Sequence, residues 1–169
     1  NEEHSGDEVK VLSIASFGES GVVLDRYGNE LMGSMMYTDP RGDKQCKTLI
    51  EKLGVHEISS RSGHSPHAMY SACKLMWIRD NEPQIYNDID VFLQYCDYIL
   101  YKLSGEKCTD WSLASRTLLF NVLNKEWDDV LLDATRIDKC ILPKINKTGD
   151  AIATISKSAK ELTGFSENT

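Results

Sequence analysis

The chain has 169 residues, of which 41% are hydrophobic and 27% are charged, so its length suits one domain or most of one, and its composition allows a core and argues against wholesale disorder. Its net charge of −7 argues against a nucleic-acid partner, which requires clustered Lys and Arg side chains. No apolar run approaches a membrane span and no signal peptide is evident, so we expect no membrane partner either.

The first part of the chain has the alternating, β-rich pattern of short strands. Val9–Ala15, Gly21–Leu24 and Leu31–Tyr37 are each predicted to be a strand. The Gly and Asn residues of Asp25–Asn29 are typical of a hairpin turn between the second and third strands. We therefore expect the chain to open with a three-stranded antiparallel meander.

The rest of the chain has mostly helical spacing. One helix is predicted over Asp43–Leu53 and stops at Gly54, and another covers Met69–Asn81, where Pro83 prevents its continuation. Residues 55–68 are rich in Ser, His and Gly and are expected to form a loop. The further helices that we expect are Ile89–Leu103, Trp111–Val122 with Thr109 or Asp110 as its cap, Asp128–Thr135 and Ile152–Leu162.

Lys74 lies in an otherwise apolar part of the helix predicted over Met69–Asn81. The apolar side chains of Leu75, Trp77 and Ile78 are expected on one side of this helix. Lys74 falls on another side, so the stretch by itself predicts a solvated surface charge.

Asp97 is unusual because its predicted helix, Val91–Leu103, is apolar on nearly every side. Such a helix is buried, and a buried carboxylate must be paired or hydrogen-bonded. Two interpretations stay open: a structural bond to a backbone amide or a nearby basic side chain, or a role in a functional site.

Glu19 follows a predicted strand end and Gly18, at the tip of a hairpin. A carboxylate there can accept hydrogen bonds from sugar hydroxyls, and a glycine lets a ligand approach the backbone. A solvated turn glutamate is the alternative. Asp39 and Arg41 lie at the end of the third predicted strand, in a sequence that is also an ordinary turn.

The cysteines and histidines predict neither a disulfide framework nor a metal site. The number of cysteines is odd at five, and no Cys-x-x-Cys occurs. His64 and His67 are close in sequence, but no third ligand is spaced to join them. A reducing, cytoplasmic location is therefore expected. The chain also contains no Gly-rich phosphate loop, Gly-x-Ser-x-Gly or His-Glu-x-x-His motif.

The order of several short motifs resembles the FGGY family of carbohydrate kinases. The first is Met69-x-Ser71-x-x-Lys74-Leu75-x-Trp77-Ile78-x-Asp80-Asn81, which is similar to a family signature at every position. The others follow in family order from about Val9 to Phe165: Tyr37-Thr38-Asp39-Pro40-Arg41, Asn81-Glu82-Pro83, Asp97-Tyr98-Ile99, Leu103-Ser104-Gly105-Glu106, Thr109-Asp110, Ala114-Ser115-Arg116-Thr117, Trp127-Asp128 and Leu142-Pro143.

This resemblance implies an α/β, ribonuclease-H-like domain of the actin and hexokinase ATPase type. It implies a two-domain kinase that transfers the γ-phosphoryl group of ATP, with Mg²⁺, to a hydroxyl of a small-molecule sugar or polyol. The chain would be part of the sugar-binding N-terminal domain. Whether it forms a homo-oligomer is left open.

By the same resemblance, the opening Asp-x-Gly-Thr hairpin would precede Asn1, the catalytic aspartate would follow Thr169, and the nucleotide-binding domain would lie outside the chain. No catalytic residue and no bound ATP or Mg²⁺ is then expected in residues 1–169, and this polypeptide alone should be inactive. The alternatives are a non-catalytic sugar-binding or regulatory module and, less favoured, a helical adaptor.

The resemblance also suggests roles for single residues. Glu19 stands where glycerol kinases have the glutamate of an Arg–Glu pair that holds hydroxyls, Gly18 takes the arginine position, and Met69 falls where they have a substrate-contacting tyrosine. The substrate-binding candidates are Gly18, Glu19, Asp39 and Met69, with Glu19 and Asp39 preferred. Four further residues are interpreted as structural signatures of the fold: Lys74, Trp77, Asp97 and Asp110.

The resemblance leaves the substrate open. Phe17-Gly18 and Tyr37–Arg41 are similar to rhamnulokinases, whereas Lys74–Trp77 is similar to xylulokinases and gluconokinases. A ketopentose, a ketohexose, a sugar acid and a polyol all remain candidates.

Overall fold

A computed structural model describes residues 9–166 and 169. Its elements in chain order are β1 (Gly21–Leu24), α1 (Asp43–Leu53), α2 (Val55–Ser62), α3 (Ser71–Asn81), α4 (Pro83–Asp88), β2 (Val91–Gln94), α5 (Tyr95–Ser104), β3 (Cys108–Asp110), α6 (Trp111–Ser115), β4 (Phe120–Asn121), β5 (Glu126–Trp127), α7 (Asp129–Thr135), the 3₁₀ helix η2 (Lys139–Ile141), β6 (Lys144–Asn146) and α8 (Lys157–Thr163). Among these described elements, none is a helix long and apolar enough to cross a membrane.

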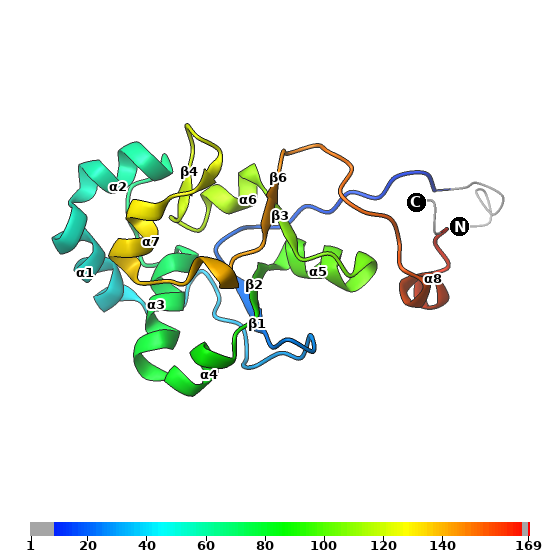
Figure 1. The fold of residues 1–169 in the computed structure, drawn as a ribbon, viewed down its shortest axis with the longest axis horizontal. Coiled ribbons are helices and arrows are strands. Elements are labelled where there is room, and N and C mark those ends of the chain that lie inside the picture. Colours follow the sequence, from blue (N-terminus) through cyan, green and yellow to red (C-terminus); the bar gives the residue numbers. More distant parts are fainter. Residues whose placement is uncertain (1–8, 167–168) are drawn as a thin grey trace.

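The strands form three small two-stranded sheets that lie among the helices. β1 pairs antiparallel with β2, β3 pairs parallel with β6, and β4 pairs antiparallel with β5. Figure 1 shows α1 and α2 at one end of the molecule and α8 at the other, with β1 and β2 between them. Every residue of β1 and β2 is buried, which explains why both strands are continuous apolar runs apart from Gln94.

The predicted three-stranded meander is wrong in two of its three strands. Gly21–Leu24 is a strand, but residues 9–15 form none, and the third segment contributes only the isolated bridge Gly21–Met35, with a second bridge, Leu24–Glu30, just before it. Val11 is 81% exposed, so the first segment buries no apolar face that would hold it in a sheet. The hairpin turn is present, because Asp25 Oδ1 accepts hydrogen bonds from the backbone N–H groups of Tyr27 and Asn29.

The true partner of β1 lies inside the segment predicted as one long helix, Ile89–Leu103. Residues 91–94 form β2 and only Tyr95–Ser104 is helical. Val91, Phe92 and Leu93 suit a strand as well as a helix, and pairing with β1 decides between them. Asp97 is the one buried residue of α5, although we predicted a helix buried on nearly every side.

The other helix predictions hold best where the sequence contains a clear stop signal. α1 ends at Gly54, whose backbone N–H donates to Ile50 O at 2.7 Å, and α3 ends before Pro83. The loop predicted over residues 55–68 is wrong in its first half, because Ile58 is fully buried and residues 55–62 form α2.

Two helices are shorter than predicted. The helix after Asp110 ends at Ser115, since Leu118 has a φ of 64° and the chain then forms β4. The last helix, α8, starts only at Lys157, where the Ser156 side chain accepts a hydrogen bond from Ala159 N.

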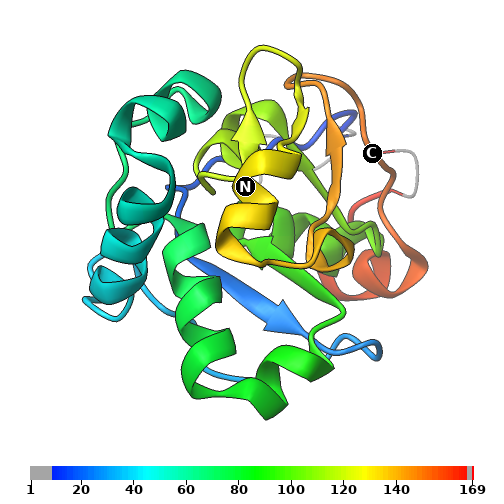
Figure 2. The ribbon, with the colours of Figure 1, turned by 60° about the vertical axis from the view of Figure 1, so that its left-hand side comes forward.

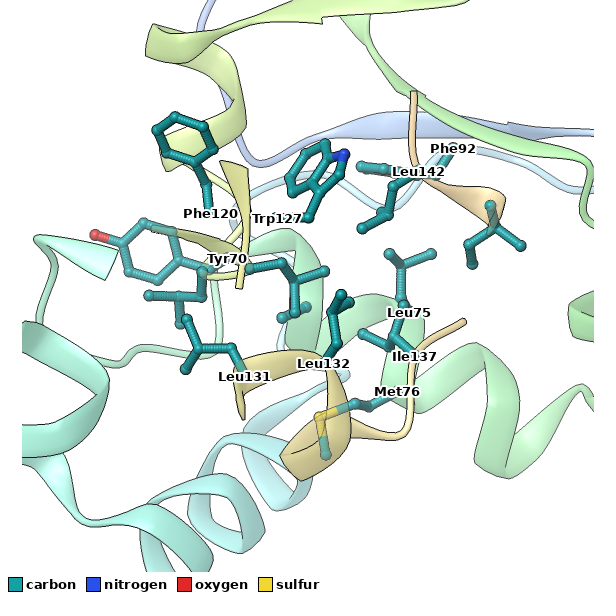
Figure 3. Close-up of a cluster of buried hydrophobic side chains, with 14 of the residues drawn as sticks. Tyr70, Leu75, Met76, Phe92, Phe120, Trp127, Leu131, Leu132, Ile137 and Leu142 are labelled. Carbon is teal, nitrogen blue, oxygen red and sulfur yellow. The ribbon is translucent and has the colours of Figure 1, made fainter. Parts of the chain in front are cut away.

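The main core lies between α3, α7 and the β1–β2 pair. Figure 2 shows β1 beside α3, and Figure 3 shows the side chains that meet there. Trp127 is buried, and its indole N–H donates to Pro143 O at 3.1 Å, whereas Trp77 and Trp111 are only partly buried at the edge of this core. The labelled core residues are Tyr70, Leu75, Met76, Phe92, Phe120, Trp127, Leu131, Leu132, Ile137 and Leu142.

Candidate functional site

Glu19 lies in a strained turn immediately before β1. Ser20 N donates a hydrogen bond to Gly18 O at 2.8 Å, and Glu19, between them, has a φ of 67°. A three-residue turn with positive φ at a non-glycine residue is rare and costs backbone energy. Such strain persists only where surrounding contacts hold it, and it is concentrated at functional sites.

The contacts that hold this turn come from distant elements. At the end of β2, Gln94 Oε1 accepts from Glu19 N at 2.9 Å. On α3, Ser71 Oγ and Lys74 Nζ donate to Glu19 O at 3.2 and 3.0 Å. Gln94 is itself fixed, because its Nε2 donates to Leu113 O at 2.6 Å. The main chain of Glu19 is therefore held on both its donor and its acceptor side.

Lys74 is buried, so the prediction of a solvated surface charge is wrong. Its side chain belongs to a helix that is buried over most of its length, with 2% of the residue exposed, and Nζ donates to Met69 O at 2.7 Å as well as to Glu19 O. Burial lowers the pKa of Lys74 to about 8, against the opposing charges of Glu19 and Asp39. The two carbonyl groups give the buried ammonium the partners that it requires.

Asp39 and Arg41 form the second part of the site. Arg41 Nε donates to Asp39 Oδ2 at 3.0 Å and Nη2 donates to the same atom at 2.6 Å. Hydrogen bonds from the Arg41 side chain hold the pKa of Asp39 below its usual value, and the Lys74 charge adds to the lowering. The guanidinium carbon of Arg41 lies 4.7 Å from the centre of the Trp77 ring, which fixes the pair against α3.

The predicted substrate-binding residues are thus brought together around one side chain. Lys74 binds the carbonyl groups of Glu19 and Met69 directly and acts electrostatically on Asp39. Gly18 precedes Glu19 in the strained turn. The grouping is a property of the fold, because residues from before β1, from the loop before α1 and from the start of α3 all meet there.

Arg116 also belongs to this site, although the sequence analysis did not select it. Its Nη2 forms an ion pair with Glu19 Oε1, and its guanidinium carbon lies 5.3 Å from the centre of the Tyr70 ring. A Cβ atom placed on Gly18 would lie only 2.8 Å from Arg116 Cβ, so the arginine stem fills the space beside the glycine. In the sequence, Arg116 stood out only as one residue of the motif Ala114-Ser115-Arg116-Thr117.

His64 lies near Arg116, beside Ser115 and Tyr70. Its Nε2 is 3.4 Å from Ser115 Oγ, and its ring is 5.4 Å from that of Tyr70. Burial lowers the pKa of His64, and the nearby Arg116 charge contributes to this lowering. A neutral imidazole is the form that suits a neighbour of a fixed cation.

A family model described as "FGGY family of carbohydrate kinases, N-terminal domain" matches residues 1–169. The chain belongs to this family. Glycerol kinase of Thermococcus gammatolerans is 30% identical over 161 residues, which cover 93% of this chain and 32% of that protein. Xylulose kinase of Staphylococcus xylosus is 28% identical over 147 residues, which cover 87% of this chain and 30% of that protein.

The structure resembles solved FGGY kinases over nearly its whole length. The crystal structure of gluconate kinase from Lactobacillus acidophilus superposes with a TM-score of 0.90 at 23% identity, over 99% of this chain and 34% of that one. This likeness confirms the actin and hexokinase type of fold. This FGGY chain spans about a third of the length of the curated relatives that it matches.

The remaining signature residues of the FGGY domain have structural contacts. Asp110 caps α6 by accepting from Leu113 N at 2.9 Å. Asp97 is 4% exposed, and burial raises its pKa to about 7, while the Thr109 hydroxyl and the Gln94 backbone oppose the rise. The interpretation of Asp97 as a structural residue stays a prediction.

The FGGY domain has a polar hollow of about 380 Å³ between the start of α1 and the end of α3. Its lining includes Arg41 and Trp77, so it adjoins the Asp39 half of the site, and the other lining residues are Pro40, Gly42, Asp43, Lys44, Gln45, Asp80 and Asn81. Within residues 9–166 and 169, no group of three or more His, Cys, Asp or Glu side chains could hold a metal ion.

Proposed function

We propose that this chain is the sugar-binding part of an ATP-dependent carbohydrate kinase, which transfers the γ-phosphoryl group of ATP to a hydroxyl of a ketose, a sugar acid or a polyol. The observation that carries the proposal is the match of the whole chain to the N-terminal domain of FGGY carbohydrate kinases. The relatives named above are a glycerol kinase, a xylulose kinase and a gluconate kinase, which is the source of these three substrate classes.

The site around Lys74 supports the sugar-binding role. Sugar hydroxyls need both hydrogen-bond donors and acceptors, and the site contains two carboxylates, two guanidinium groups and an imidazole within one polar region. Its geometry is pre-formed, because the strained turn at Glu19 is fixed from three side chains. A fixed site loses less conformational entropy when it binds its ligand.

The ATP and Mg²⁺ sites are assigned to other parts of the protein. The family model that matches this chain is an N-terminal domain, and the chain covers about a third of its curated relatives, so the rest of such a protein can supply these sites. This chain would bind and orient the sugar, while the phosphate cradle and the general base would be supplied elsewhere. A small-molecule sugar is the partner that we propose, in the cytoplasm.

The test is ADP release by the protein that carries this chain with its native flanking sequence. Glycerol, xylulose, L-fuculose and gluconate would each be supplied with ATP and Mg²⁺. Clear turnover of one class would support the proposal and name the substrate, and Glu19→Ala should then raise KM or lower kcat. A folded protein that binds ATP but turns over none of these compounds would instead favour a non-catalytic regulatory module.

A further inference from the structure

Glu19 and Arg116 form one unit, but only one of them faces solvent. The Glu19 side chain is 4% exposed, whereas the Arg116 side chain is 35% exposed. Arg116 therefore covers the carboxylate, and an incoming ligand meets the guanidinium first. A guanidinium has five N–H donors in a fixed fork, so pairing with Glu19 leaves others directed outward.

Two neighbours fix the position of this guanidinium. The Tyr70 ring lies against it at 5.3 Å, and the missing side chain of Gly18 leaves room for the arginine stem. A Cβ atom at position 18 would lie 2.9 Å from Arg116 Cγ and 3.1 Å from Gln94 Oε1. Any side chain there would push Arg116 away from Glu19, so the glycine is required for the pair.

We propose that Arg116 is the residue that donates hydrogen bonds to substrate hydroxyls, and that its ion pair with Glu19 makes the site select a neutral ketose or polyol over a sugar acid. This inference rests on the proposed kinase function. It assigns Glu19 a positioning role, because the buried carboxylate acts through the guanidinium that covers it.

The charges of the site support the choice of a neutral substrate. Arg116 is paired with Glu19 and Arg41 with Asp39, while the buried Lys74 ammonium donates to two carbonyl groups. The two arginines are each matched by a carboxylate, and the third cation, Lys74, is 2% exposed and directs its ammonium at the two carbonyl groups, away from an entering ligand. The guanidinium groups within reach of a ligand are thus already neutralised, so the carboxylate of a sugar acid finds no free counter-charge there and is repelled by Glu19 and Asp39, whereas a hydroxyl accepts from Arg116 without that repulsion.

The experiment measures the affinity of the flanked protein for glycerol, xylulose and gluconate by calorimetry, together with KM from ADP release. Wild type should bind xylulose or glycerol more tightly than gluconate. Arg116→Ala should weaken binding of the preferred compound about tenfold or more, because a charge-assisted hydrogen bond is lost. Gly18→Ala should have an effect of the same size, because it displaces Arg116 without removing it.

Two variants separate this role from a structural one. Arg116→Lys keeps the charge and the packing over Gly18, so it should fold normally yet still weaken binding through loss of the fork. Arg26→Ala is the matched control, because Arg26 is an exposed arginine that lies 4.8 Å from the centre of the Tyr27 ring and should leave binding unchanged.

Glu19→Gln tests the selectivity. The amide keeps the shape of the side chain but leaves Arg116 without its counter-charge, so affinity for gluconate relative to xylulose should rise about two- to fivefold. No change in this ratio would overturn the charge argument, and Arg116→Ala binding within twofold of wild type would overturn the role of Arg116. If the protein turns over a sugar but neither the Glu19→Gln nor the Arg116→Ala result is obtained, the inference about Arg116 is wrong and the proposed kinase function stands. If no compound binds or turns over, the proposed kinase function is wrong as well.

Discussion

Asp97→Asn changes a buried carboxylate that sits in the first turn of α5 with 4% of the residue exposed. Burial raises the pKa of this carboxyl from 3.8 to about 7. Between about pH 4 and pH 7 the folded state therefore keeps a proton that the unfolded chain has released. Wild-type stability contributed by Asp97 is present below that window and is lost as the pH rises through it.

The size of the effect follows from the two pKa values. One unit of pKa difference corresponds to about 1.36 kcal/mol. Between pH 5 and pH 8 the free energy of unfolding of the wild type should therefore fall by about 2–3 kcal/mol through Asp97, and the permanently neutral asparagine of Asp97→Asn makes no such contribution. Relative to wild type, Asp97→Asn should therefore become more stable by this amount over that pH range, whatever its stability at pH 5.

The assay is urea unfolding followed by tryptophan fluorescence at pH 5 and pH 8, since Trp127 is buried in the core. Asp129→Asn is the control, because the Asp129 side chain is 81% exposed and its replacement should shift stability equally at both pH values. If the stability difference between Asp97→Asn and wild type were the same at pH 5 and pH 8, the carboxyl would titrate alike in the folded and unfolded chains, and the reasoning would be refuted.

Three further predictions concern the core, the buried lysine and the isolated chain. Burial holds the pKa of Lys74 near 8 in the folded chain, against an ordinary value of 10.5, so between these values the unfolded chain binds a proton that the folded chain does not. The free energy of unfolding of the wild type should therefore rise by about 2 kcal/mol between pH 7 and pH 9.5, and Lys74→Met should abolish this rise in urea unfolding at the two pH values. Leu75→Ala, at a fully buried position, should cost about 2–5 kcal/mol in the same assay, whereas Leu123→Ala, at a 79% exposed position, should change stability by less than about 0.5 kcal/mol. Residues 1–169 alone should release no ADP with any sugar above a control without protein, and turnover by this polypeptide would contradict the assignment of the phosphate site to other parts of the protein.

The sequence predicts local structure well where a local signal decides it. The glycine after α1, the proline after α3 and the Asp110 cap are each visible in a few neighbouring residues, and the structure confirms all three. β2 is different, because residues 91–94 suit a strand or a helix and the choice depends on β1, some seventy residues earlier. A single sequence carries no direct signal for that pairing.

The candidate site divides in the same way. Glu19 and Asp39 were suggested by residue type and by resemblance, and the structure places both near Lys74. The burial of Lys74 could not be predicted, since its ammonium donates to main-chain oxygens of Glu19 and Met69, which have no sequence signal. Arg116 could have been suspected from Gly18, where the resemblance calls for an arginine and the sequence has none.

The turn at Glu19 has a consequence for how the site comes into being. Its three holding contacts join residues that are 52, 55 and 75 positions apart in the chain. Contacts of such separation form only when the chain has closed long loops, so no short peptide containing Glu19 can hold this conformation. The site is therefore a product of the finished tertiary structure, and a sugar that binds it selects the folded chain and raises its melting temperature with concentration.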